Sequence, residues 1–382
     1  MTRKPLPISK YIDVEKRTVD AIGKIVAQLS HNKIDRYSSL LGFDACIDHI
    51  VRIVKNKKEN SDPEFFSRSS QFGEFLVNQG NRSCGVELRN QVSKIGGNMV
   101  ITANALGNLG VKVNCIGTFG LPDILPVFRS MSPNCSLHTV GETISATALE
   151  FTESKVIMFD PGPYCELSWN GIKELLGIEH LKQLFTGKQL ISFLNWSEIE
   201  NSSLIWQGIL DEMLPLLLPS ESPELFFTDL SDCSRKSKKE ILLALNLLGR
   251  FRKYSKVILS LNRNEAGLIA EALDLPANSS DKEFIKSLYD RTKIDIITIH
   301  QTADALAYDG FVFEKCDTFY CKEPVILTGG GDNFNAGFGF AQLLGFDLFD
   351  TLVVANAVSG YYVKNGTSPD NNQLMAFLQQ NM

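Results

Sequence analysis

The second half of the chain alternates regularly between short apolar segments and amphipathic ones. Four apolar segments have the length of buried strands: 190–194, 225–229, 257–261 and 294–299. Four segments with helical spacing separate or flank them: near 203–217, 236–252, 265–273 and 282–291. This order is typical of a parallel sheet that is covered by helices on both faces. It predicts an α/β fold with a doubly wound, mostly parallel sheet.

The first half follows a different pattern. Segments near 46–54, 86–95 and 145–159 alternate apolar and polar residues, as strands with one exposed face do. We expect them to form a small β-sheet beside the main one, and we expect the first strand, at 39–43, to run on through residue 51. Residues 57–83 are polar and are interpreted as an insertion. Residues 1–35 are interpreted as an N-terminal helical extension to an α/β domain at 36–382.

Composition excludes several classes of protein. The 382 residues carry a formal net charge of −6, without the basic footprint of a nucleic-acid-binding protein. No apolar run reaches membrane-spanning length, and the N-terminus lacks the apolar core of a signal peptide. The eight cysteines include no C-x-x-C pair, which favours reduced thiols over a disulfide framework or a zinc site. We therefore expect a cytoplasmic protein that binds neither nucleic acid nor membranes.

A glycine-rich turn, Gly329-Gly330-Gly331-Asp332, opens a long apolar segment. Glycines let a ligand approach the backbone closely, and free N–H groups at a helix start favour an anion. A carboxylate beside such an anion has a natural task in taking a proton from an attacking hydroxyl. The alternative is that Asp332 is only a helix cap and the glycines only a tight turn.

Polar groups from distant parts of the chain are expected at the same end of the sheet. Asp48 lies a few residues beyond the segment 39–43, Gly96-Gly97-Asn98 stands at a turn, and Asn262 to Glu265 follows a strand end. Ligands of open α/β sheets bind beyond the carboxyl ends of the strands. Together with the glycine turn, these groups predict one shared crevice.

These motifs resemble those of the ribokinase-like carbohydrate kinases of the phosphofructokinase-B type. Gly329 to Phe338 resembles the family's second signature, G-A-G-D-x-F-x-A-G-F, and Gly96-Gly97 resembles the start of its first signature. Asn262-x-x-Glu265 resembles its N-x-x-E element, and Asp48 its early sugar-binding aspartate. The resemblance covers most of the chain from about residue 40 to the C-terminus and leaves the N-terminal helix and the 57–83 insertion outside it.

The resemblance implies transfer of the γ-phosphoryl group of ATP to a sugar hydroxyl, with the small sheet acting as a lid. It assigns Asp332 as general base and Gly329, Gly330 and Gly331 as an anion hole. It places sugar against Asp48, Gly96, Gly97 and Asn98, and the nucleotide against Thr298 and Asn356. Asn262 and Glu265 are implied to hold Mg²⁺ through water molecules. Exposed strand edges of the lid favour a homodimer.

Three departures from the family pattern leave alternatives open. Ile326 replaces the usual aspartate before the glycines, Ile101 replaces an asparagine, and His300 replaces a glycine of the nucleotide loop. An ADP-dependent sugar kinase, a nucleoside kinase and a catalytically weak sugar or nucleotide sensor therefore stay possible, and the sugar is unspecified. A Rossmann oxidoreductase and a P-loop NTPase lack their glycine motifs here. Asp44 is left open between a sugar ligand and a strand-end cap.

Overall fold

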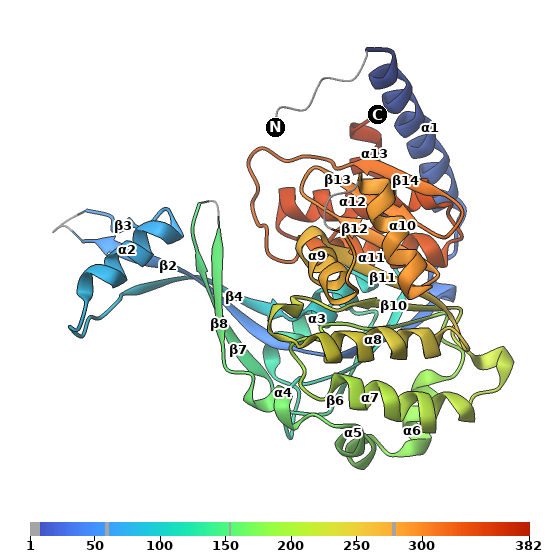
Figure 1. Ribbon diagram of the computed structural model, residues 1–382, viewed down its shortest axis with the longest axis horizontal. Helices are drawn as coiled ribbons and strands as arrows, with labels where there is room; N and C mark the ends of the chain where they lie inside the picture. The colour runs from blue at the N-terminus through green and yellow to red at the C-terminus, as the bar shows by residue number, and fades with distance from the viewer. Residues whose placement is uncertain (1–7, 58–60, 153, 277–279) are drawn as a thin grey trace.

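The computed structural model describes residues 8–57, 61–152, 154–276 and 280–382, with side chains from Lys16 onward. Its central sheet has the order β14-β13-β12-β11-β10-β9-β1-β5-β6 (Figure 1). The strands are β1 (Ser38–Phe43), β5 (Lys112–Gly117), β6 (Cys135–Thr139), β9 (Leu190–Phe193), β10 (Leu225–Asp229), β11 (Lys256–Asn262), β12 (Ile296–His300), β13 (Asp304–Tyr308) and β14 (Phe313–Asp317). Neighbours from β12 to β6 are parallel, whereas β13 pairs antiparallel with both β12 and β14. This confirms the predicted mostly parallel sheet.

Helices cover both faces of this sheet (Figure 1). One face carries α1 (Ile8–His31), α3 (Asn98–Asn108), α11 (Gly330–Leu343), α12 (Leu348–Asn365) and α13 (Asn371–Gln380). The other carries α5 (Trp169–Leu176), α6 (Ile178–Phe185), α7 (Ser202–Gly208), α8 (Lys238–Phe251), α9 (Arg263–Ala272) and α10 (Asp281–Thr292). Successive strand residues such as Leu190 and Ile191 bury into opposite layers, which explains why these strands are apolar throughout.

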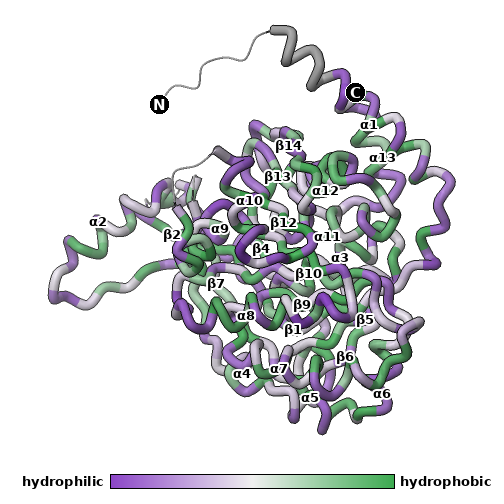
Figure 2. The backbone as a smooth tube through the Cα atoms, turned by 45° about the vertical axis from the view of Figure 1, so that its right-hand side comes forward, coloured by the Kyte–Doolittle hydropathy of each residue, from purple (hydrophilic) through white to green (hydrophobic). Residues whose placement is uncertain are grey.

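A second, smaller sheet forms the lid. It consists of β2 (Cys46–Asn56), β3 (Glu64–Phe65), β4 (Leu88–Gly96), β7 (Ile144–Glu150) and β8 (Lys155–Phe159), in the order β3-β2-β7-β8 with β4 also paired to β2. Helix α2 (Ser69–Gln79) projects from the body in both views (Figures 1 and 2). It packs Phe72 and Phe75 against Phe66 and Phe151, so the predicted insertion shares a small core with the lid strands.

Several predicted boundaries were wrong. The chain leaves the central sheet after Phe43 and enters the lid at Cys46, so the predicted strand through residue 51 is two strands in two sheets. The antiparallel pair β13 and β14 was missed, as was β6. The predicted helix at 203–217 ends its α-helical part at Gly208 and continues as a short π segment and a 3₁₀ turn, where Pro215 cannot donate a helical hydrogen bond.

The predicted N-terminal helix packs onto the domain. Ile22, Ile25 and Leu29 of α1 are buried, and the Arg17 guanidinium lies 2.8 Å from a Glu314 carboxylate oxygen. Figure 1 shows α1 beside α13 at the edge of the body. Across the described residues, no helix combines the length and the apolar character needed to span a membrane. The cytoplasmic location stays a prediction.

Asp44 ties the end of β1 to the start of α3 and to the segment after β9. It follows β1 and is fully buried, with Oδ1 accepting the Met99 N–H at 3.0 Å and Oδ2 accepting the Asn195 amide at 3.1 Å. A Cβ at Gly97 would lie 2.8 Å from Oδ2, so only glycine allows this approach. Both oxygens serve the protein itself, which favours the strand-end cap over a sugar ligand.

The buried Asp44 carboxyl predicts a pH-dependent stability. Burial raises the pKa of Asp44 from 3.8 to about 6. A raised carboxyl pKa contributes stability that is complete below the unfolded pKa and is lost as pH rises through the folded one. The stability difference between wild type and Asp44→Asn should therefore shift against the wild type by roughly 2–3 kcal/mol between about pH 4 and pH 7. Urea unfolding across this range measures it, and pH-independent differences would contradict the assignment.

Candidate active site

The glycine turn forms the start of α11. Gly329 has φ +96°, a left-handed backbone that glycine adopts without strain, and the first helical bond runs from Asn333 N–H to Gly329 O at 3.0 Å. Gly330 N–H is already bound to Leu327 O at 3.2 Å. Among the described residues, no acceptor contacts the N–H groups of Gly329, Gly331 or Asp332. The turn thus has free donors for an anion, although Gly330 does not add the predicted N–H.

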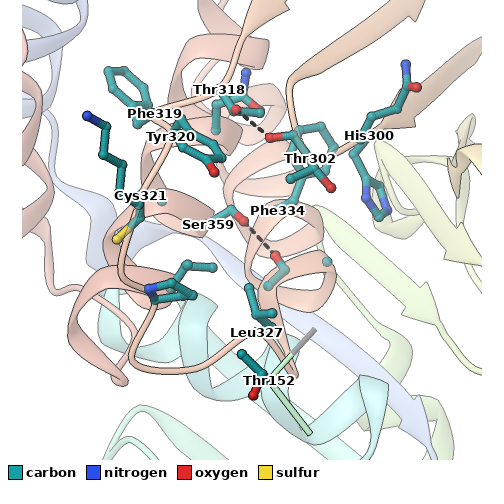
Figure 3. Close-up of a pocket in the computed structure, with 18 residues that line it drawn as sticks. Thr152, His300, Thr302, Thr318, Phe319, Tyr320, Cys321, Leu327, Phe334 and Ser359 are labelled. Atoms are coloured by element: carbon teal, nitrogen blue, oxygen red, sulfur yellow. Dashed lines mark hydrogen bonds between the residues drawn. The ribbon is translucent and has the colours of Figure 1, made fainter. Parts of the chain in front are cut away.

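Helix α12 holds the turn in place through two hydrogen bonds. The Tyr362 hydroxyl donates to Thr328 O at 2.8 Å, and the Ser359 hydroxyl donates to Gly330 O at 2.8 Å, as Figure 3 shows for Ser359. A Cβ at Gly329 would lie 2.8 Å from the Tyr362 hydroxyl oxygen. The backbone carbonyls are thereby engaged, and the free N–H groups are held in a fixed direction.

A pocket opens on each side of this turn. The first, the Asp48 pocket, has a volume of about 510 Å³, and its polar lining includes Asp48, Asn98, Lys155, Asn195, Asp232, Arg235, Thr328 and Asp332. The second, the Asn356 pocket, has a volume of about 660 Å³, and its lining includes His300, Thr302, Thr318, Tyr320, Leu327, Gly330, Gly331, Asn356 and Ser359 (Figure 3). The four-residue segment Gly329 to Asp332 contributes to both pockets. Two ligands in these pockets would meet at the turn.

Asp332 faces the Asp48 pocket from the first turn of α11. Burial raises the pKa of Asp332 well above its ordinary value, and the carboxylates of Asp229 and Asp44 add to the effect. A carboxylate with a raised pKa is a stronger base than a solvated one. Asp332 therefore has both the position and the basicity to accept a proton from a hydroxyl in the Asp48 pocket.

The lid and the start of α3 supply the other predicted groups of the Asp48 pocket. Asp48 on β2 accepts a hydrogen bond from the Cys46 thiol at 3.4 Å, and burial raises its pKa. A Cβ at Gly96 would lie 2.4 Å from the Asp48 carboxylate, so Gly96 makes room for Asp48 and does not itself line the pocket. Gly97 and Asn98 line it directly, and the Asn98 amide donates to Ser231 Oγ at 2.7 Å.

Of the two residues predicted to bind the nucleotide, only one lines the pocket. Asn356 lines its pocket and donates from Nδ2 to the carbonyls of Asp317, at 3.2 Å, and Cys316, at 3.4 Å. Thr298 is fully buried in β12, where its hydroxyl donates to Leu306 O at 2.9 Å. It lies two residues before the end of β12 and outside the pocket lining, whereas His300 at the strand end lines the pocket. A nucleotide-binding role for Thr298 stays a prediction.

His300 takes the place in the pocket that Thr298 was expected to occupy. Its ring centroid lies 5.0 Å from that of Phe334, and a Cβ at Gly331 would lie 3.1 Å from Cε1. Burial lowers the pKa of His300 to about 4, so the ring is neutral at physiological pH. The departure from glycine thus places an uncharged ring against the glycine turn.

Asn262 and Glu265 line neither pocket, although Asn262 is paired across the sheet with His300, which lines the Asn356 pocket. Asn262 caps α9 by accepting the Glu265 N–H at 3.0 Å, while its own N–H and amide donate to the two Glu265 oxygens at 2.7 and 2.6 Å. Burial raises the pKa of Glu265 to about 9, and Asp229 adds to the shift. In the part of the chain that the structure describes, no cluster of three or more His, Cys, Asp or Glu side chains forms a metal cage. These oxygen donors suit Mg²⁺ that keeps most of its water molecules.

Several pocket residues were missed from the sequence. Asn195 and Ser231 follow the ends of β9 and β10 with φ of +57° and +61°, and polar residues at strand ends were a signal for them. Asp232 caps a 3₁₀ turn and also lines the Asp48 pocket. Lys155 gave no such signal, because a lysine at the start of an alternating strand is normally solvated.

Comparison with known proteins agrees with this geometry. The profile of the prokaryotic ketohexokinase family matches residues 14–381. A ketohexokinase of Haloferax volcanii is 25% identical over 347 residues, which cover 90% of this chain and 92% of the relative.

Solved structures share the fold. An adenosine kinase from Sinorhizobium meliloti superposes with a TM-score of 0.64 at 15% identity, over 91% of this chain and 99% of its own. A putative ribokinase II from E. coli, solved in complex with ATP and Mg²⁺, superposes with a TM-score of 0.59 at 13% identity, over 90% and 99%. The chain belongs to the prokaryotic ketohexokinase family and is a carbohydrate kinase of the ribokinase fold.

Proposed function

We propose that this protein transfers the γ-phosphoryl group of ATP to a hydroxyl of a ketohexose. The observation that carries the proposal is the position of the glycine turn between two pockets, with Asp332 on one side and Asn356 on the other. The family and the ketohexokinase relative support the choice of sugar. The ATP and Mg²⁺ bound to the E. coli neighbour support the choice of donor.

The pockets suggest which substrate enters where. The Asp48 pocket offers carboxylate and amide groups from Asp48, Asn98 and Asn195, which can accept and donate hydrogen bonds to several sugar hydroxyls at once. The Asn356 pocket offers an apolar wall with Phe334 and leads to Gly330 and Gly331. We assign the sugar to the first pocket and the nucleotide to the second.

The chemistry follows from this placement. The sugar hydroxyl attacks the γ-phosphorus, its proton passes to the Asp332 carboxylate, and the bond between phosphorus and the ADP oxygen breaks. Free N–H groups of Gly329, Gly331 and Asp332 donate to the phosphoryl oxygens, where negative charge is concentrated. Phosphoryl transfer depends mainly on positioning and charge stabilisation, and the turn contributes to both.

Mg²⁺ would be held by water molecules bonded to Asn262 and Glu265 and by the phosphates. When bound, it neutralises phosphate charge during transfer. The Asn262–Glu265 hydrogen bonds keep these oxygens in place beside the turn.

A substrate panel tests the proposed function. ADP release is measured with ATP and with D-fructose, other ketohexoses, D-glucose, D-ribose and adenosine, and AMP release is measured with ADP as donor. We expect kcat/KM for a ketohexose with ATP to exceed that for aldoses and adenosine by at least about tenfold, the size of one or two lost hydrogen bonds. Preference for adenosine would indicate a nucleoside kinase, preference for ADP would reverse the donor, and binding without turnover would indicate a sensor.

Replacing Asp332 tests the general base. Asp332→Asn keeps the size of the side chain but cannot take the proton, so kcat should fall by roughly 10²-fold or more. The sugar dissociation constant, measured by calorimetry, should change by only a few-fold because Asp48 and Asn98 remain. Near-normal turnover would remove Asp332 from the mechanism.

We also propose a homodimer formed through the lid. Strand β8 is an edge of the lid sheet, and apolar side chains are exposed on both outer strands, including Leu88, Val92, Val156 and Met158. Pairing with a second copy would cover both the edge and these side chains. Light scattering should give twice the chain mass of 42.5 kDa, and the double variant Val156→Lys/Met158→Lys should give a monomer. A monomeric wild type at assay concentration would overturn the dimer.

A further inference from the structure

The β7–β8 hairpin of the lid reaches both pockets at the glycine turn. Thr152, just after β7, lines the Asn356 pocket, and Lys155, at the start of β8, lines the Asp48 pocket. The backbone closes the hairpin with a bond from Phe151 N–H to Ser154 O at 2.9 Å. Thr152 and Lys155 therefore lie at the boundary that a transferred phosphoryl group would cross.

Two lid lysines converge on the residue before the turn. Lys155 Nζ donates to the Thr328 hydroxyl at 2.9 Å. Lys94 Nζ on β4 donates to the Tyr362 hydroxyl at 3.0 Å, and that hydroxyl donates to Thr328 O at 2.8 Å. The lid is thus bonded to Thr328 from two strands, directly through Lys155 and indirectly through Lys94.

The carboxylates around the turn require a cation if a phosphoryl group is to bind there. Carboxylates of Asp48, Asp229 and Asp44 lie close enough to Asp332 to raise its pKa further after burial, and Lys155 acts in the opposite direction. A phosphoryl group entering this acidic surrounding is repelled unless positive charge compensates. The free N–H groups of the glycine turn and a bound Mg²⁺ would supply part of this positive charge.

Lys155 is placed to supply the remaining positive charge. The other cation lining the Asp48 pocket, Arg235, is bonded to the carboxylate of Glu198. Lys155 makes no ion pair with any residue that the structure describes, and its hydrogen-bond partner is a neutral hydroxyl. Its ammonium can therefore exchange this partner for an anion without breaking an ion pair.

We propose that Lys155 is a catalytic residue that donates a hydrogen bond from its ammonium to the transferred phosphoryl group, while Lys94 and Tyr362 position the turn beneath it. The inference rests on the proposed kinase function. Lys155 keeps its proton throughout, since the proton of the sugar hydroxyl goes to Asp332 and the leaving electron pair goes to the ADP oxygen.

The following experiment distinguishes a catalytic role of Lys155 from a role in closing the lid only. Lys155→Ala should lower kcat by roughly 10²-fold, as loss of one donor to a transition-state oxygen does, with the KM for sugar and ATP changed only a few-fold. Propylammonium added to Lys155→Ala should restore kcat at least about tenfold, whereas tetramethylammonium at equal ionic strength, which has no N–H donor, should not. Lys155→Arg should retain part of kcat. The matched control is Lys55→Met, which removes another lid lysine. Lys55 Nζ lies 2.9 Å from a Glu64 carboxylate oxygen and lines neither pocket, so this variant should keep kcat within about twofold of wild type.

Two results would overturn the role of Lys155 while leaving the kinase function intact. One is a Lys155→Ala variant with kcat within about threefold of wild type. The other is a loss that lies in the sugar KM alone and is not rescued by propylammonium, which would make Lys155 a lid latch. A wild type that phosphorylates none of the sugars would instead overturn the proposed function and this role together.

Discussion

The left-handed backbone at Gly329 is the constraint on which the site depends. It turns the chain into α11 so that the N–H groups of Gly329, Gly331 and Asp332 find no acceptor in the part of the chain that the structure describes and can bind an anion. Two hydroxyls of α12 bond the turn's carbonyls, so the turn cannot relax by reversing these peptide units. The same constraint sets Asp332 on the opposite side from Gly330 and Gly331, and it thereby divides the crevice into two pockets.

The second constraint is the close approach of the lid to the central sheet. Gly96 and Gly97 let two carboxylates come within distances that any Cβ would prohibit, Asp48 from the lid and Asp44 from the end of β1. The Asp44 oxygens accept hydrogen bonds from Met99 at the start of α3 and from Asn195 after β9. Asp48 instead faces the pocket. The division of roles between two aspartates four residues apart follows from which of them has its hydrogen bonds satisfied by the protein.

Much of the fold and part of the site could be predicted from residues. Apolar segments separated by helices predicted the parallel sheet because strands buried on both faces are apolar throughout. The glycine turn and Asp48 belong to motifs with local physical requirements, and the structure places Asp48 and Asp332 in the same pocket. β13 and β14 were missed because short strands with charged residues near a sheet edge have little pattern.

Other parts of the site depend on tertiary structure. Thr298 and His300 share one face of β12, but Thr298 lies two residues before the strand end, outside the pocket lining, and only the tertiary structure shows which of the two reaches the pocket. Lys155 acquires its position only when the hairpin folds over Thr328, which is 173 residues away in the sequence. Asn262 and Glu265 cap a helix by geometry that a motif predicts, while their use by a metal ion depends on phosphates that arrive with the substrate.

The most direct test is a crystal structure with a ketohexose and a non-hydrolysable ATP analogue bound together. Our account predicts the sugar against Asp48 with one hydroxyl in hydrogen-bond contact with Asp332, and the triphosphate reaching the Gly329 to Asp332 turn from the Asn356 pocket. A sugar bound away from Asp332, or a triphosphate that does not reach the turn, would contradict it.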